Sequence, residues 1–180
     1  MNETIFLFLN NIAFQYPWLD TLIIFCAQWL PYLIIGIFIF YYAYKIFKEN
    51  QLFKKYLKEM LFVLITAFFI FGISQIINYF YYSPRPFLVL DNINLLFTHG
   101  STDSFPSGHT TFFFSLTFIS YFFTPRLLST FILDGAIMVA VCRIIAGVHW
   151  PLDIFGGIIL AGIGVFLIKR IIFAFCSDFV

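Results

Sequence analysis

The chain has 180 residues, of which 62% are hydrophobic, 23% aromatic and only 11% charged. A soluble domain carries about 45–50% apolar and about 25% charged residues, so this composition excludes that class and indicates an integral membrane protein. Ten basic residues against nine acidic ones leave no basic surface for nucleic acid and exclude a charged, disordered chain.

The first 18 residues form an apolar segment that is too short to cross a bilayer. A membrane-spanning helix needs about 20 apolar residues. The segment also carries the polar pair Asn10 and Asn11 and lacks the basic start of a signal peptide. We therefore expect residues 1–18 to form an interfacial helix that lies against the membrane.

Five longer apolar runs follow, and each is read as a membrane span. They are expected at about residues 20–45, 60–83, 106–123, 127–147 and 151–172. Pro151 fits the first turn of the last helix, where the missing N–H of proline costs nothing. The predicted fold class is all-α: a polytopic membrane helix bundle of about five transmembrane helices plus an N-terminal interfacial helix, with residues 1–180 forming a single domain.

Basic residues fall mostly on one side of this predicted topology. Eight of the ten lie there, namely Lys45, Lys48, Lys54, Lys55, Lys58, Arg126, Lys169 and Arg170. The positive-inside rule makes that side cytoplasmic, together with the 45–59 loop and the C-terminus. Arg85 and Arg143 lie on the outer side, where insertion does not favour them, so they require another explanation.

Three helix ends bring ionisable residues together on the outer side. The set comprises Arg85, His109, Arg143, His149 and Asp153. Taken singly, an arginine could snorkel to lipid headgroups and a histidine could cap a helix. The convergence of all five instead predicts a functional site.

Residue chemistry predicts phosphoryl transfer at this site. Two guanidiniums and a helix that opens with Ser107, Gly108 and His109 provide donors for a phosphate group. Asp153, four positions after His149, can accept a proton from one imidazole nitrogen and leave the other as a nucleophile. His109, on a different helix, can supply the acid for the leaving oxygen.

A divalent metal is the alternative interpretation of the His-x-x-x-Asp pattern. The site offers only His109, His149 and Asp153 as ligands, and the two arginines would repel a cation. We therefore expect neither a metal nor another cofactor.

At these residues the sequence resembles the type 2 phosphatidic acid phosphatase superfamily of integral membrane lipid phosphatases. The family signature is a lysine, six residues and Arg-Pro; then Pro-Ser-Gly-His; then Ser-Arg, five residues, His, three residues and Asp. The second part is complete here at residues 106–109, and the third ends on His149 and Asp153. Asn78 replaces the lysine and Cys142 the serine, so one phosphate contact is expected to be weaker or made differently.

The resemblance implies a role for each matching residue. His149 would attack phosphorus, Asp153 would orient it and His109 would protonate the leaving oxygen. The residues that would bind the phosphoryl group are Arg85, Ser107, Gly108 and Arg143, with an uncharged donor at Asn78.

The resemblance is strongest to small bacterial undecaprenyl pyrophosphate phosphatases. It implies conversion of a lipid pyrophosphate, most specifically undecaprenyl pyrophosphate, to the monophosphate on the outer side of a bacterial inner membrane, with lipids as the surrounding partners. The alternatives are a lipid phosphotransferase, a phosphatase of phosphatidic acid or phosphatidylglycerol phosphate, and a non-enzymatic channel or assembly subunit.

Several further polar residues and cysteines are expected to lie outside the chemistry. His99 is interpreted as a solvated loop residue and Asp134 as a structural carboxylate within the fourth span. The three cysteines, which show no metal or disulfide spacing, are predicted to be packing residues; they are Cys26, Cys142 and Cys176.

Overall fold

The structure is a computed structural model, and it describes residues 1–98 and 100–175. Its helical elements, in chain order, are α1 (Asn2–Asn10), α2 (Pro17–Ile24), the π-helical turn η1 (Phe25–Trp29), α3 (Leu30–Lys48), the short 3-10 turn η2 (Asn50–Leu52), α4 (Phe53–Phe80), α5 (Pro86–Val89), α6 (Gly108–Ser120), α7 (Arg126–Ile145) and α8 (Pro151–Phe175). The expected all-α membrane bundle is confirmed.

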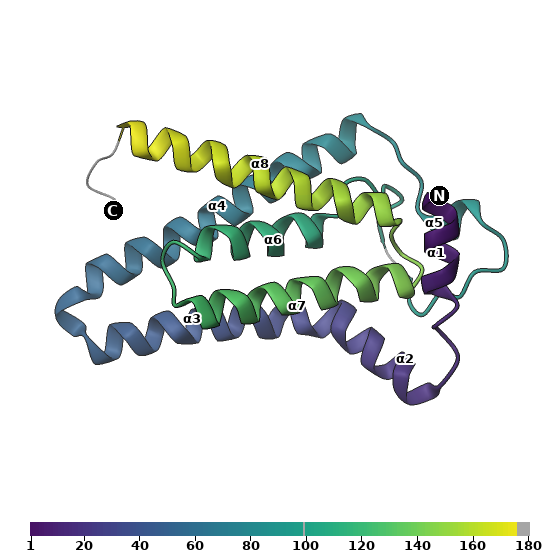
Figure 1. Cartoon of the computed structure of the whole chain (residues 1–180), viewed down its shortest axis with the longest axis horizontal. Coiled ribbons are helices and arrows are strands. Elements are labelled where there is room, and N and C mark those ends of the chain that lie inside the picture. Colours follow the sequence, from purple (N-terminus) through teal and green to yellow (C-terminus); the bar gives the residue numbers. More distant parts are fainter. Residues whose placement is uncertain (99, 176–180) are drawn as a thin grey trace.

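Within residues 1–98 and 100–175, four helical segments are long and apolar enough to cross a membrane. They are Pro17–Lys48, which joins α2, η1 and α3; Asn50–Phe80; Arg126–Ile145; and Pro151–Ile172. The turn between α3 and α4 lies at one end of the bundle with the C-terminal end of α8, and α1 and α5 lie at the other (Figure 1). Most of the basic residues therefore lie at the end opposite α1.

The third predicted span, at about residues 106–123, is the central helix α6, which is shorter than expected. It has 13 residues, which correspond to about 20 Å at a rise of about 1.5 Å per residue. Ser107 caps its start, and a turn over residues 121–124 ends it before Pro125. Because α4, α7 and α8 pack around it, most of its side chains are buried.

Small residues allow these helices to approach one another closely. A Cβ atom at Gly157 of α8 would lie 3.1 Å from the backbone oxygen of Ser107, and one at Gly164 would lie 2.8 Å from the Ile70 side chain on α4. The first of these contacts seats the start of α8 against the start of α6. Two of the predicted site segments are thereby brought side by side.

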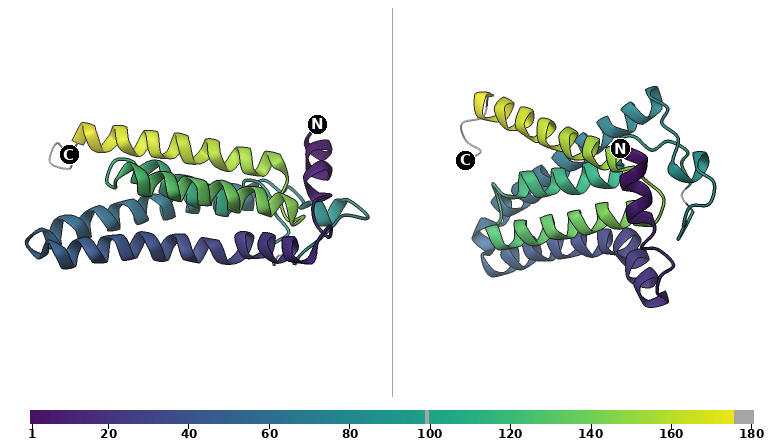
Figure 2. Two further views of the ribbon diagram at one scale, coloured as in Figure 1. Left: turned by 60° about the horizontal axis from the view of Figure 1, so that its bottom comes forward. Right: turned by 45° about the vertical axis from the view of Figure 1, so that its right-hand side comes forward.

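The N-terminal segment differs from a helix of 18 residues. α1 ends at Asn10, and after a turn the first long helix begins at Pro17, where proline suits the first helical turn. The Asp20 side chain stabilises this turn by accepting from the backbone N–H of Phe14 at 2.8 Å. α1 lies across the end of the bundle rather than along it (Figure 2).

The structure also places the residues that were expected to be outside the chemistry. Asp134 is exposed on the outer surface of α7, because its position turns it away from the buried face that Gly135 and Ala136 occupy. Cys26 is buried and Cys142 half-buried, and neither forms a disulfide bond. His99 and Cys176 lie outside the described residues.

Candidate active site

The connection between α7 and α8 places His149 through a specific helix ending. Gly147 has φ of +85°, a left-handed conformation that glycine adopts without strain. The N–H of Val148 donates to the Arg143 carbonyl at 3.2 Å and that of Gly147 to the Ile144 carbonyl at 3.0 Å. This pair of bonds is the Schellman motif. It reverses the chain within a few residues, so that His149 comes to lie next to the first turn of α8.

His149 and Asp153 form a buried pair at the start of α8. Nδ1 of His149 lies 3.3 Å from Oδ2 of Asp153, and both residues are 2% exposed. The same carboxylate oxygen accepts from the backbone N–H of Trp150 at 2.7 Å and from the Ser104 hydroxyl. A carboxylate held this way keeps the proton of His149 on Nδ1, which assigns the lone pair to Nε2.

Arg85 faces the other side of the same imidazole. Its Nη1 lies 3.2 Å from Nε2 of His149 and donates to the Val148 carbonyl at 2.6 Å, while its Nε donates to the Ser101 carbonyl at 2.7 Å. Burial lowers the pKa of Arg85 to about 10, against the opposing effect of Asp153 and Asp103. Arg85 therefore remains a cation at neutral pH, beside the nitrogen that would act as the nucleophile.

Arg143 is a buried cation with few partners. Its Nη1 donates to the Ala27 carbonyl at 3.2 Å. Pro31, four residues after Ala27, has no N–H and so cannot form the α-helical bond to this carbonyl. Within the described chain, Nε and Nη2 of Arg143 are buried without any hydrogen-bond partner. Because an unpaired buried charge is costly, these two atoms indicate an anion-binding position.

The start of α6 supplies the remaining predicted residues. Ser107 caps the helix, its Oγ accepting from the N–H of Thr110, and its own N–H donates to the Asp153 carbonyl at 3.0 Å. Gly108 and the half-buried His109 follow in the first turn. A Cβ at Gly108 would lie 2.9 Å from the Phe71 ring, so a larger residue would push against α4.

Asn78 is engaged with the backbone that precedes α6. With its amide oriented so that the nitrogen meets acceptors, it donates to the Phe105 carbonyl at 2.7 Å and to the Ser74 carbonyl at 2.9 Å. The sequence predicted that Asn78 would contact phosphate; in the structure its amide nitrogen contacts backbone carbonyls instead. We interpret Asn78 as holding the segment that leads from Ser104 to Ser107.

Replacing Asn78 with aspartate should test this interpretation. The carboxylate has nearly the same shape but no N–H, so it would face two carbonyl oxygens and lower the free energy of unfolding by about 1–3 kcal/mol. Unfolding of the two proteins in detergent, followed by circular dichroism, measures the difference. Equal free energies of unfolding for the wild type and the aspartate variant would argue against the bonds from Asn78 to the Phe105 and Ser74 carbonyls.

Two contributors to the site were not singled out from the sequence. Ser104 donates to Asp153, and its hydroxyl lies 3.3 Å from Nδ1 of His149. The Ala27 carbonyl is the other. Ser104 could have been found because it is the polar residue just before the Phe-Pro-Ser-Gly-His run. Ala27 could have been found because a proline lies four residues after it within a helical segment.

The structure brings the predicted residues together to different degrees. Arg85, His149 and Asp153 are in direct contact, and Ser107 joins them through Asp153. Arg143 is connected to the group through the α7–α8 turn and is close enough to Arg85 for their charges to interact. Among the described residues, no three His, Cys, Asp or Glu side chains are grouped to hold a metal ion.

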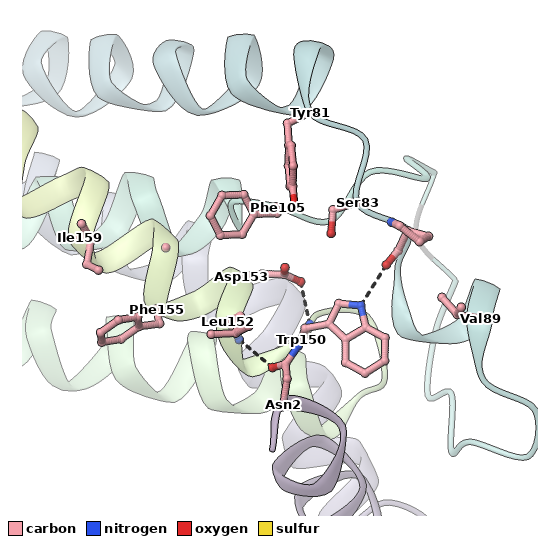
Figure 3. Close-up of a pocket in the computed structure, with 12 residues that line it drawn as sticks. Asn2, Tyr81, Ser83, Val89, Phe105, Trp150, Leu152, Asp153, Phe155 and Ile159 are labelled. Atoms are coloured by element: carbon pink, nitrogen blue, oxygen red, sulfur yellow. Dashed lines mark hydrogen bonds between the residues drawn. The ribbon is translucent and has the colours of Figure 1, made fainter.

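An apolar groove of about 520 Å³ leads away from the site. It is lined mainly by apolar and aromatic side chains, and Asp153 is part of its wall. Figure 3 shows Asp153 between the Phe105 ring and Leu152, with Phe155 and Ile159 continuing along α8. The groove therefore connects the charged site to the lipid-facing length of α8.

Comparison with known proteins gives a consistent result. A family model described as the PAP2 superfamily matches residues 56–176. The chain is 30% identical over 162 residues to the bacitracin transport permease protein BcrC of Bacillus licheniformis, a match that covers 89% of this chain and 75% of that protein. It is 28% identical over 170 residues to the undecaprenyl-diphosphatase BcrC of Bacillus subtilis strain 168, covering 94% and 83% respectively.

The fold is also similar to a solved structure. The crystal structure of LpxE from Aquifex aeolicus superposes with a TM-score of 0.73 at 25% sequence identity, over 94% of each chain. The similarity therefore extends over nearly the whole chain.

Proposed function

Since the chain belongs to the PAP2 superfamily, and is therefore a membrane lipid phosphatase, we propose that it hydrolyses a lipid diphosphate to the monophosphate through a phosphohistidine. Undecaprenyl diphosphate is the proposed substrate, because a relative that covers almost the whole chain is named for that activity. Two observations together carry the proposal: the buried, unpartnered guanidinium atoms of Arg143 and the buried His149–Asp153 pair.

In the first step, Nε2 of His149 attacks the terminal phosphorus of the diphosphate. The bond from that phosphorus to the bridging oxygen breaks, and the lipid monophosphate leaves with a proton from His109. Asp153 stabilises the positive charge that develops on the imidazole, because it holds the Nδ1 proton.

In the second step, water attacks the phosphohistidine. His109, now a base, takes a proton from the water, and inorganic phosphate leaves as the N–P bond breaks. Arg85 and Arg143 offset the negative charge of the transferring group in both steps, and the backbone N–H groups at the start of α6 add donors. Pre-oriented charge of this kind is the main source of rate enhancement in phosphoryl transfer.

The apolar groove would receive the part of the lipid chain nearest to the phosphates. Its wall includes Asp153 and extends along α8 as far as Ile159, the direction in which a lipid chain enters a membrane. The site lies at the end opposite most of the basic residues, which the positive-inside rule makes the outer side. We therefore propose that the enzyme acts on the outer leaflet of a bacterial plasma membrane.

Replacing Ile159 with tryptophan should separate long substrates from short ones. Ile159 lines the groove away from the phosphate site, so a larger side chain would obstruct the lipid chain but leave the charged residues in place. We expect KM for undecaprenyl diphosphate to rise by about tenfold relative to KM for a five-carbon isoprenyl diphosphate.

Ile163→Trp is the matched control for this comparison. Ile163 lies one turn further along α8, is 54% exposed and is not part of the groove wall. The ratio of the two KM values should remain that of the wild type. The same ratio in all three proteins would exclude this groove as the chain-binding site.

Release of inorganic phosphate by the purified protein in detergent is the direct test of the function. Undecaprenyl diphosphate, phosphatidic acid and phosphatidylglycerol phosphate should be compared with EDTA present. We expect turnover with all chelatable metal removed and the highest kcat/KM for undecaprenyl diphosphate. No turnover on any of them would contradict the proposal, and a preference for a glycerolipid would reassign the substrate.

The name of the Bacillus licheniformis relative, a bacitracin transport permease protein, favours transport as the second candidate. A transporter would not need His149 as a nucleophile, whereas an enzyme that releases phosphate would. Product analysis in the presence of a second lipid separates hydrolysis from phosphotransfer, since transfer would place the phosphate on that lipid instead of releasing it.

A further inference from the structure

The short helix α1 contacts the α7–α8 connection along one face. Asn2, Phe6 and Asn10 are spaced by four residues, so their side chains emerge on the same side of the helix. Phe6 is 0% and Asn10 2% exposed, while Leu7 and Phe8 point outward. This face touches the segment that carries Arg143, His149 and Asp153 at three separate points.

Asn2 completes the start of α8. Trp150 precedes the first residue of α8 and so occupies the capping position, but its side chain has no hydrogen-bond acceptor. The carboxylate of Asp153 accepts from the backbone N–H of Trp150, and Oδ1 of Asn2 accepts from the N–H of Leu152 at 3.1 Å. The cap of the catalytic helix therefore comes in part from α1.

Phe6 packs against Trp150, which lies between His149 and Asp153 in the sequence. Its ring lies 5.1 Å from the Trp150 ring, measured between centroids. The indole Nε1 of Trp150 in turn donates to the Pro84 carbonyl at 2.9 Å, directly before Arg85. Packing from α1 thus reaches both His149, through its neighbour, and the Arg85 segment.

Asn10 joins the end of α7 to the outer loop. Its Nδ2 donates to the carbonyls of Ile145 at 2.9 Å and of Asn94 at 2.7 Å, and its Oδ1 accepts from the N–H of Asn94 at 2.8 Å. A Cβ at Gly147 would lie 2.8 Å from the Asn94 carbonyl, so the loop presses directly against the turn. Every polar atom of this buried amide is engaged.

We propose that α1 is a positioning element that holds His149 and Arg143 in their reactive arrangement through Asn2, Phe6 and Asn10. The effect on catalysis rests on the proposed function. The inference assigns to α1 a role beyond contact with the membrane surface. These three residues act through the α7–α8 connection and not on the substrate's phosphates. The family model begins at residue 56, so the role falls outside the matched segment.

Asn10→Ala and Asn2→Ala should lower kcat for the lipid diphosphate by about tenfold or more, with KM within about twofold of the wild type, because small misplacements of reacting groups have effects of this size. Hydrogen–deuterium exchange of peptides that cover residues 143–153 should become faster in both variants. Asn2→Asp keeps an acceptor for the N–H of Leu152 and should restore most of the lost kcat.

Asn11→Ala is the matched control, since Asn11 is the next residue and its side chain is exposed. Its kcat and its exchange should equal those of the wild type. Variants that match Asn11→Ala in both measurements would overturn the inference, as would a rise in KM at unchanged kcat. If Asn10→Ala does not fold, Asn2→Ala and Asn2→Asp decide. An inactive wild type would refute the proposed function, while the exchange rates would still test whether α1 holds the turn.

Discussion

Replacing His149 with alanine is expected to lower kcat for lipid diphosphate hydrolysis by about 10⁴-fold or more, the range found when a catalytic nucleophile is removed. The variant loses the atom that would form the bond to phosphorus. Water would have to attack the diphosphate directly, with Arg85 and Arg143 still stabilising charge. Phosphate release by purified wild type and variant, measured side by side in detergent, gives the ratio.

Trapping the intermediate strengthens this test. Substrate labelled with ³²P in its terminal phosphate should transfer label to the wild-type protein when the reaction is stopped in alkali, because phosphohistidine is stable to base and labile to acid. His149→Ala should take up no label. Asp134→Asn serves as the control, since Asp134 is exposed on the outer surface of α7. A variant that retains kcat or label would assign the nucleophile to another residue.

The membrane bundle and much of the site could be predicted because charge is scarce in this sequence. Eight of the ten basic residues fall on one side of the predicted topology, so Arg85 and Arg143 stood out as exceptions. The spacing of four between His149 and Asp153 predicted a contact on one side of a helix, and the structure contains that contact at 3.3 Å. Such local patterns depend only on helix geometry.

Contacts between distant segments could not be predicted in the same way. Asn10 was interpreted as a polar interruption in a membrane-surface helix, yet it bonds residues 84 and 135 positions away. Nothing in its neighbourhood identifies those partners, because they depend on how the bundle end closes. The exposed position of Asp134 is similar: the sequence indicates that it lies within a span but not which side of α7 the other helices cover.

Asn78 shows how a substitution can change the kind of contact that a position makes. The resemblance predicted a weakened phosphate contact where the family has lysine. An amide is short and has both donors and acceptors, so it can bond the Phe105 carbonyl beside it, whereas a lysine carries its charge further from the helix. The position still supports the start of α6, through the backbone.

Replacing Arg143 with methionine should lower the activity without lowering the stability of the protein. Methionine replaces the apolar stem of arginine but has no charge to bury, and only the bond to the Ala27 carbonyl is lost. We expect the free energy of unfolding to stay the same or to rise by about 1–4 kcal/mol, as when other buried charges are replaced by apolar residues. Activity should fall by about 10²–10³-fold, since a charge aimed at the phosphoryl group is removed.

Arg85→Met is the informative comparison, because the guanidinium of Arg85 stabilises the fold and would also take part in the reaction. It donates to the buried carbonyl of Val148 and to the carbonyl of Ser101, and the loss of the bond to Val148 should cost about 1–3 kcal/mol. Both variants should therefore lose activity, while only Arg85→Met should be less stable in urea unfolding without phosphate. An equal loss of stability in Arg143→Met would mean that Arg143 is a structural residue, and its unpartnered atoms would no longer support an anion-binding role.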